Sequence, residues 1–337
     1  MKTTHTFPDD WVARKNVLFI TTKNLNYIRN AQEIACLRRS AGQLQVIGCE
    51  KGGTISRLLR VWLRLLFLPV RSYDVVFIGF APQLILPFWG WKFRKQTVVA
   101  DFFISFYETL VFDRQIFRTK SLAAALAHRL DTTVCQRADR VFADTCADAD
   151  YFIRKFGLTA EKTKVFYLEA DMSVFYPRKS LPARLGPTEK FVVLYFGSIL
   201  PLQGVDVILQ CVRLMRQDTS IVFNLIGPVP QKERRLCADL PNVHFTDWLP
   251  QNDLAERIAQ ADLCLAGHFN ARIQKACRTI PGKAYIYHAM GKPMILGDNP
   301  ANHELFDENG KTVYYVRMGD AGSLAEKIRQ IALHAVQ

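Results

Sequence analysis

The chain has 337 residues, of which 49% are hydrophobic and 22% are charged, so it is long enough for two folded domains and too apolar to be disordered. Its formal charge of +13 and its pI of about 9.4 predict an anionic partner, which would be nucleic acid, an acidic membrane surface or a phosphorylated small molecule. No motif of nucleic-acid binding accompanies this charge, so the sequence favours the other two partners.

The cysteine pattern and the N-terminal sequence indicate the cellular compartment in which the protein is expected. Eight cysteines are scattered without a C-x-x-C pair, which is typical of reduced thiols in the core of a cytosolic protein. The N-terminal residues lack the apolar core of a secretory signal, and no apolar run reaches the length of a membrane-spanning helix. We therefore expect a cytoplasmic protein that does not cross a bilayer.

Strand and helix patterns alternate in the first half of the chain. Residues 16–22 form an apolar run of strand length, a helical pattern that ends at Gly42 follows, and residues 44–49 have the pattern of a second strand. This β-α-β order predicts a doubly wound parallel sheet. No glycine cradle follows the first strand, which disfavours a dinucleotide site there.

Residues 54–68 predict an amphipathic helix, with Arg57, Arg60 and Arg64 on one face and leucines with Trp62 over the rest. Such a helix can lie in the interface of an anionic membrane, and the mixture of tryptophan and lysine in residues 86–95 suits the same layer. These four residues are therefore expected membrane contacts. The alternative is a buried crossover helix followed by a basic loop.

A polar and aromatic loop follows the strand predicted to end at Asp101. Because sites in parallel sheets lie at the carboxyl ends of strands, side chains of this loop are candidates to face a substrate. Two of its carboxylates could handle a proton, although acids seven residues apart also occur by chance. The candidates are Asp101, Ser105, Tyr107, Glu108 and Asp113.

A possible metal motif occurs further on, where Asp148 and Asp150 form a D-x-D. Paired carboxylates can hold a divalent cation. The pair also opens an apparent helix, where acidic residues favour the positive end of the helix dipole, and we favour this explanation. The histidines show no ligand spacing either, so no metal site is expected.

A linker is predicted where proline, glycine and basic residues cluster, at residues 177–187. The domain boundary is expected near Arg184, which gives a first domain of residues 1–184 and a second of residues 185–337. The second domain restarts the strand-helix pattern. Its last helix could pack back on the first domain.

Two stretches of the second half suit phosphate oxygens. A strand pattern over residues 191–197 runs into a loop with Gly197 and Gly204 and then into a helix start, so free N–H groups converge there. Residues 275–299 begin with Lys275, Arg278 and Lys283 around a Pro-Gly break before another helix. A solvated basic turn is the alternative for that stretch.

Six segments in order make the second half similar to the donor domain of retaining glycosyltransferases of family 4. They are YFGSILPLQGVDVIL, NLIGP, HFTDWLP, ADLCLAG, KACRTIPGKAY and AMGKPMILGDNPANHELF. The first half agrees more loosely, through DFFISFYETLVFDR, ADRVFADT and EADMSVFYPR. The resemblance implies the GT-B fold, in which two Rossmann-like, doubly wound parallel-sheet domains face each other across a cleft.

The resemblance also implies which residues bind the donor, a nucleotide-diphosphate sugar. Gly197, Ser198 and Gly204 would cradle the diphosphate, and three residues would lie near the base. The family usually has a basic pair where this chain has Ser198 and Gln203, so cations from the second stretch are expected to supply the charge. The residues near the base are Pro228, Asp247 and Leu249, and the cations are Lys275, Arg278 and Lys283.

A further departure concerns two glutamates that the family carries eight residues apart, for the donor sugar and the ribose. Their nearest counterparts here are Gly267 or Arg278 for the first and Ile286 for the second, so neither carboxylate is present.

The implied activity is metal-independent, hexosyltransferase-like transfer with retention, to a lipid-linked or polysaccharide acceptor in cell-envelope glycan synthesis. The donor β-phosphate would take the acceptor proton, and Lys275 would stabilise the leaving diphosphate. Asp101 or Glu108 would orient the acceptor, with Ser105 and Tyr107 in contact with it. No cofactor beyond the nucleotide sugar is implied, and the protein would be peripheral on the inner face of the cell membrane. The missing glutamates leave a second hypothesis open, a catalytically inactive GT-B subunit or scaffold at the membrane.

Overall fold

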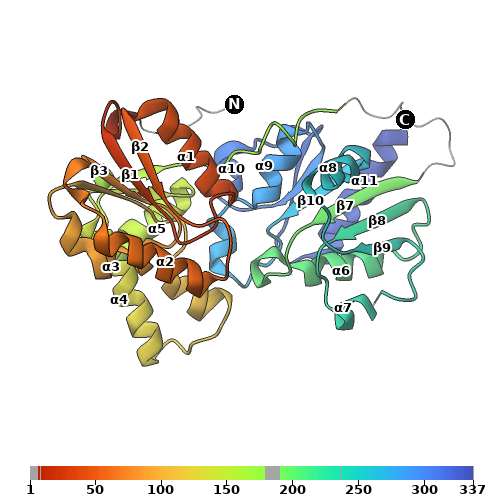
Figure 1. Ribbon diagram of the computed structural model, residues 1–337. Helices are drawn as coiled ribbons and strands as arrows, with labels where there is room; N and C mark the ends of the chain where they lie inside the picture. The colour runs from red at the N-terminus through yellow and green to blue at the C-terminus, as the bar shows by residue number, and fades with distance from the viewer. Residues whose placement is uncertain (1–6, 8, 179–189, 236, 337) are drawn as a thin grey trace. The chain divides into compact units, whose positions relative to one another are not determined.

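The structure is a computed structural model that describes residues 7, 9–178, 190–235 and 237–336. Contacts along the chain divide it into two compact units, Met1–Leu168 and Glu169–Gln337. Each unit is built on one six-stranded parallel sheet with flanking helices (Figure 1). This pair of sheets confirms the predicted doubly wound parallel architecture. The boundary predicted near Arg184 lies outside the described residues.

The first unit has the strand order β2-β1-β3-β4-β5-β6, and every neighbouring pair is parallel. The order reverses between β1 and β3, since the chain first adds β2 on one side of β1 and then four strands, β3 to β6, on the other. The strands are β1 (Asn16–Ile20), β2 (Gln43–Ile47), β3 (Val75–Ile78), β4 (Thr97–Asp101), β5 (Arg140–Ala143) and β6 (Thr163–Val165). The helices are α1 (Ile28–Ser40), α2 (Thr54–Phe67), α3 (Leu86–Trp89), α4 (Leu122–Arg137) and α5 (Cys146–Phe156).

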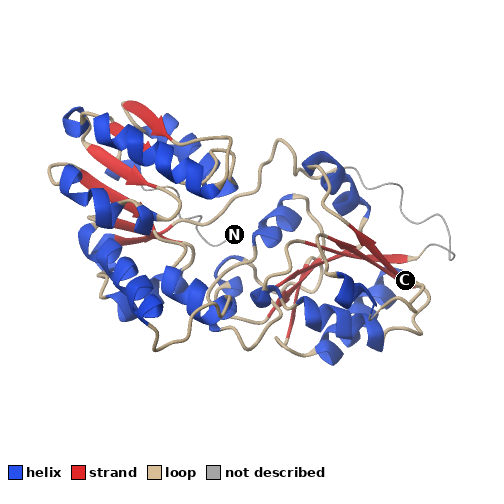
Figure 2. Ribbon diagram, turned by 60° about the horizontal axis from the view of Figure 1, so that its bottom comes forward, coloured by secondary structure: helices blue, strands red, loops and turns tan. Residues whose placement is uncertain are grey.

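Strand β1 shows why this sheet is covered on both faces. Val17 and Phe19 belong to one apolar cluster, which includes residues of α1, whereas Leu18 and Ile20 belong to another, which includes residues of α2 to α5. Successive strand side chains point to opposite faces, so a strand that is apolar at every position needs helices on both sides. Figure 2 shows the strands enclosed by helices in this way.

The second unit has the strand order β12-β11-β10-β7-β8-β9, again all parallel. Here the order reverses between β7 and β10. The strands are β7 (Phe191–Phe196), β8 (Ile221–Ile226), β9 (Val243–Thr246), β10 (Leu263–Gly267), β11 (Met294–Gly297) and β12 (Val313–Val316). The helices are α6 (Val205–Leu214), α7 (Gln231–Arg235), α8 (Gln251–Gln260), α9 (Gly282–Ala289), α10 (Asn302–Leu305) and α11 (Ala321–Val336).

The last helix, α11, packs against α6 of its own unit. Its residues Leu324 and Ile328 are fully buried in the core cluster that also contains Ile208 and Val212 of α6. Within the described residues, no helix is both long and apolar enough to cross a bilayer. None of the eight cysteines forms a disulfide, and six of them are buried, as the sequence predicts for core thiols.

Candidate donor and acceptor sites

The carboxyl edge of the second sheet is built for close backbone packing. Strands β7, β8 and β10 are each closed by a glycine with positive φ: Gly197 at 147°, Gly227 at 137° and Gly267 at 84°. A Cβ atom on Gly227 would lie 2.2 Å from the Gly197 carbonyl oxygen, and one on Gly204 would lie 2.7 Å from the Asn270 nitrogen. Only glycine fits these positions. Because the strand order reverses between β7 and β10, this edge is where a doubly wound sheet binds a ligand.

Lys283 reaches this edge from the first turn of α9. Its side chain is buried, its Nζ donates a hydrogen bond to Gln203 Oε1, and Nζ lies 4.8 Å from the centre of the Tyr195 ring. Its Cε would be 3.2 Å from a Cβ on Gly197. Burial lowers the pKa of Lys283 to about 7. The structure therefore brings Gly197, Gln203 and Lys283 together, although 80 residues separate the last two.

The remaining two predicted cations lie in and after a 3₁₀ turn, Gln274–Cys277. Lys275 is half-buried, and its carbonyl oxygen accepts a hydrogen bond from Thr279 Oγ1 at 3.0 Å. Arg278 follows the turn and is also half-buried. Lys275 is near enough to His268 for its charge to act on that ring.

His268, directly after β10, is a residue that the sequence analysis gave no role. It is buried, with Nδ1 3.5 Å from Thr279 Oγ1. Burial, and then the charges of Lys283 and Lys275, lower its pKa to about 3, so the imidazole is neutral at physiological pH. No ligand spacing could have signalled it, because its partners come from a different turn.

The residues expected near the base follow β8 and β9 at the same edge. Pro228 is exposed, and Leu249 is half-buried. Asp247 accepts a hydrogen bond from Arg234 at 2.6 Å. A hollow of about 530 Å³ adjoins the Gly204 turn through Asn270, and two arginines that the sequence analysis did not single out line it, Arg272 and Arg317.

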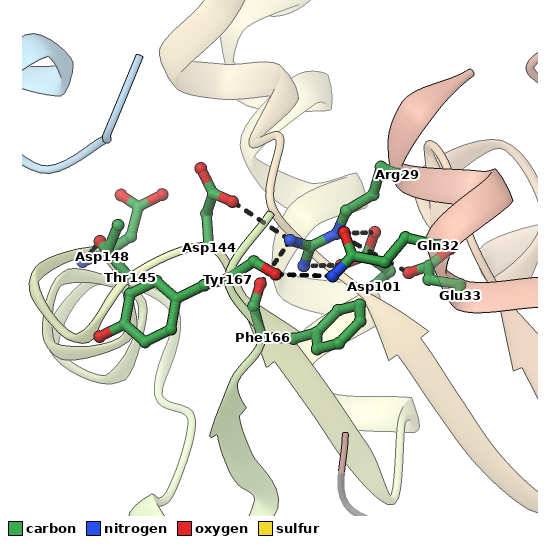
Figure 3. Close-up of polar contacts among 9 residues, drawn as sticks. All are labelled: Arg29, Gln32, Glu33, Asp101, Asp144, Thr145, Asp148, Phe166 and Tyr167. Carbon is green, nitrogen blue, oxygen red and sulfur yellow. Dashed lines mark hydrogen bonds and ion pairs between the residues drawn. The ribbon is translucent and has the colours of Figure 1, made fainter. Parts of the chain in front are cut away.

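In the first unit, Asp101 has a different setting from the one predicted. Its Oδ1 and Oδ2 accept hydrogen bonds from Arg29 at 2.8 and 3.1 Å, and both side chains are buried. Arg29 also donates to Asp144 Oδ1 at 3.2 Å and to the Phe166 carbonyl (Figure 3). Arg29 thus ties α1 to the end of β4 through Asp101 and to the residues after β5 and β6 through Asp144 and Phe166, and the burial of Asp101 disfavours its expected role in orienting an acceptor.

Glu33 completes this buried group. It is fully buried, with an oxygen 3.9 Å from Arg29 Nε. Burial, followed by the charge of Asp101, raises the pKa of Glu33 well above its usual range. The cluster therefore holds one guanidinium against several carboxylates, and burial favours the protonated form of Glu33.

The predicted acceptor residues of the loop after β4 are organised by Asp131 of α4. Asp131 accepts hydrogen bonds from Ser105 Oγ at 2.7 Å and from the Tyr107 nitrogen at 2.8 Å, and it is itself buried. Burial raises the pKa of Asp131, and these hydrogen bonds oppose the rise. Ser105 is buried in this contact, so it shapes the loop and does not present a hydroxyl to solvent. Glu108 is also buried, at the start of a π-helical segment, Glu108–Asp113.

The reversal point of the first sheet carries residues that the sequence analysis missed. Lys23, after β1, lies over the rings of Tyr27 and Phe80, at 5.6 and 5.3 Å from their centres. Phe103, after β4, completes a half-buried aromatic group with these two rings. Thr22 Oγ1 donates to the Phe80 carbonyl at 3.2 Å, which joins the ends of β1 and β3. The only sequence signal was a polar residue after an apolar strand.

The D-x-D pair lies at the start of α5, as the helix-start explanation predicts. Asp148 is in the first turn, and its nitrogen donates to the capping Thr145 Oγ1 at 3.0 Å. Asp150 is exposed on the same helix. Across the described residues, no group of His, Cys, Asp and Glu could hold a metal ion.

The predicted membrane helix is observed as α2, and three of its side chains donate hydrogen bonds to backbone carbonyls. Arg57 donates to the Gly52 carbonyl at 2.6 Å and to the Thr22 carbonyl at 3.3 Å, and Arg64 donates to the Gly48 carbonyl at 3.2 Å. Trp62 is half-buried, and its indole donates to the Leu84 carbonyl at 3.0 Å. These hydrogen bonds attach the helix to its own unit, while Arg60 and Arg64 remain exposed, so their expected contact with a membrane stays a prediction.

Comparisons with known proteins agree with this architecture. Residues 190–334 match a family model described as Glycosyl transferases group 1. D-inositol 3-phosphate glycosyltransferase 1 of Catenulispora acidiphila is 30% identical over 145 residues, which is 35% of this chain and 35% of that relative. The match thus spans about a third of the curated relative's length.

Solved structures extend the likeness over both units. Sucrose-phosphate synthase of Thermosynechococcus elongatus has a TM-score of 0.69 at 16% identity, over 96% of this chain and 91% of that one. Anabaena HepE, solved in complex with UDP and glucose, has a TM-score of 0.59 at 16% identity, over 95% and 92%. The protein thus has the fold of GT-B glycosyltransferases, and residues 190–334, in its second unit, are similar to the Glycosyl transferases group 1 model.

Proposed function

We propose that this protein is a glycosyltransferase that takes a sugar from a nucleotide-diphosphate sugar held by the second unit. The observation that carries the proposal is the contact of Lys283 with the Gly197 turn, inside the region that matches the family model. A buried cation beside glycine-lined backbone suits a pyrophosphate. The UDP and glucose of the similar HepE structure support a donor of this class.

The chemistry follows from the charge that develops as the sugar leaves. The departing diphosphate gains negative charge, and Lys283 and Lys275, with backbone N–H groups of the Gly197 turn, would stabilise it. We propose that the transfer needs no metal, because these cations would supply the positive charge that a metal supplies in other transferases. We propose transfer with retention, in which a donor phosphate oxygen takes the proton of the acceptor hydroxyl.

For the acceptor we propose the carboxyl edge of the first sheet, at Lys23, Tyr27 and Phe80. The rings offer an apolar platform, and the ammonium suits an anionic group on the acceptor. We propose a lipid-linked or polysaccharide acceptor of cell-envelope glycans, at an anionic membrane surface. The name of the curated relative, a glycosyltransferase acting on inositol 3-phosphate, supports an acceptor that carries a phosphate.

A second candidate, a GT-B subunit without transferase activity, is favoured by one observation. Gly267 or Arg278 stands where the family resemblance places the first carboxylate, Ile286 stands where it places the second, and the side chain of Ile286 is buried. No carboxylate at any of these positions is available for the ribose or sugar hydroxyls. This candidate predicts that no nucleotide stabilises the folded protein.

A thermal-shift panel of nucleotide sugars separates the two candidates. The transferase hypothesis expects one donor to raise Tm in the wild-type protein and in a Lys311→Met control, which changes an exposed lysine. It expects Lys283→Met to lose the shift. If no nucleotide shifts the wild-type Tm, the donor site is absent and the second candidate stands.

A further inference from the structure

One side of helix α2 exposes a continuous row of apolar residues. Ile55, Leu59 and Leu63 recur at every fourth position and therefore share one face of the helix. Leu66 and Phe67 continue the face at its end, and all five side chains are at least 54% exposed. The opposite face is the one that packs, since Val61 and Leu65 are fully buried in the core.

Two exposed aromatic residues of the next helical segments extend this surface. Phe88 of α3 contacts Trp62 of α2, with ring centres 5.2 Å apart, and Trp91 stacks on Trp89 at 6.5 Å. Phe88 and Trp91 are themselves exposed. A contiguous apolar patch of this kind is uncommon on a monomer's surface and marks a place of interaction.

The two chain segments that carry the patch, residues 51–73 and 80–97, have charged side chains of positive sign only. Together they contain eight lysines and arginines and neither aspartate nor glutamate. Lys92 donates to the Leu65 and Leu66 carbonyls at the end of α2. Arg94 and Arg137 line a cavity of about 320 Å³ with Trp91, and the one acid there, Asp139, accepts a hydrogen bond from the Val98 nitrogen.

We infer that this α2–α3 face docks on the surface of an anionic phospholipid bilayer. Leucine, isoleucine and phenylalanine would enter the acyl boundary, Trp91 would lie at the headgroup level, and the cations would meet the lipid phosphates. A second copy of the chain fits poorly, because an isologous contact would bring like charges together.

Helix α2 lies next to the edge of the first sheet at which we propose that the acceptor binds. The first turn of the helix lies beside the carboxyl end of β1, where Arg57 donates to the Thr22 carbonyl. Lys23 follows directly. A bilayer along the α2 face would therefore lie beside the edge at which we propose the acceptor binds. The docking itself requires no transferase activity and can fail independently of it.

Sedimentation with vesicles tests the inference. The probe is a vesicle of equal parts phosphatidylcholine and phosphatidylglycerol, compared with phosphatidylcholine alone. We expect the wild-type protein to sediment with the anionic vesicles, less so at high salt, and Leu59→Ser with Leu63→Ser to weaken binding by about tenfold or more, since two inserted side chains are lost.

The matched control is Leu122→Ser with Leu126→Ser, which changes two exposed leucines of α4 in the same unit. It should bind vesicles as the wild-type protein does. Equal binding by both double variants, or no binding by the wild-type protein, would overturn the inference. So would a wild-type dimer in size-exclusion chromatography that Leu59→Ser with Leu63→Ser converts to a monomer, because the face would then cover a second copy.

Discussion

At the scale of single residues, Lys283 makes the donor site sensitive to pH. Burial lowers its pKa to about 7 in the empty protein, whereas a diphosphate beside it would favour the charged ammonium. Nucleotide binding should therefore take up a proton, and affinity for UDP should weaken as pH rises from about 7 to 9, by up to roughly tenfold per pH unit. Calorimetric titration of the wild-type protein and Lys283→Met measures this, and the variant should show weak binding with little pH dependence.

The same lysine should make the stability of the empty protein increase with pH, whereas the affinity for UDP decreases with pH. Its folded pKa lies below the value of 10.5 for an unperturbed lysine, so the unfolded chain binds more protons between about pH 7 and 10.5. The contribution of Lys283 to the free energy of unfolding should rise with pH across that window. Urea unfolding at two pH values should show the rise in the wild-type protein, with a smaller rise in Lys283→Met; equal rises would mean that the lysine titrates normally.

The buried Arg29–Asp101 ion pair is expected to stabilise the fold, and replacing Asp101 distinguishes this role from contact with an acceptor. Replacing Asp101 with asparagine removes one of the negative charges that balance the buried guanidinium of Arg29. This loss should lower the free energy of unfolding by about 3–5 kcal/mol. Denaturant unfolding measures the loss, and Asp150→Asn, an exposed change, is the control. A stable Asp101→Asn protein with a raised KM for acceptor would restore the catalytic assignment.

At the scale of elements, the close packing of the second sheet's edge depends on particular glycines. Gly227→Ala places a methyl group 2.2 Å from the Gly197 carbonyl, so the ends of β7 and β8 must separate. Gly291 also has positive φ, but a Cβ there meets no atom within 4 Å. We expect Gly291→Ala to cost about 1 kcal/mol, from backbone strain alone. Gly227→Ala should cost more and also abolish the nucleotide thermal shift; equal costs would refute the close-packing argument.

Individual elements also show how far the sequence could predict this protein. The apolar run of residues 16–22 and the amphipathic pattern of residues 54–68 predict β1 (Asn16–Ile20) and α2 (Thr54–Phe67) directly, because local periodicity determines them. The burial of Asp101 could not be predicted. Its partner is 72 residues away, and nothing local marks Arg29 as buried. The hydrogen bonds of the α2 arginines could not be predicted for a related reason, since Arg57 and Arg64 donate to carbonyls of the preceding loop and no helical pattern reports such contacts.

At the scale of the whole molecule, each unit has its own sheet and core, so a ligand of one unit should stabilise that unit first. A nucleotide that binds only the second unit adds about 2.7 kcal/mol to its unfolding free energy at a concentration 100 times Kd. Hydrogen exchange followed by mass spectrometry should therefore show slower exchange in the core strands β7, β8 and β10 on addition of the donor, with β1 and β3 unchanged. Phospholipid vesicles should instead slow exchange in peptides that contain α2 and leave β7, β8 and β10 unchanged. If the nucleotide protects the core strands of both units equally, the two units unfold as one. The variant Lys283→Met then decides the assignment. Loss of protection in this variant places the donor site in the second unit, and unchanged protection excludes it from there.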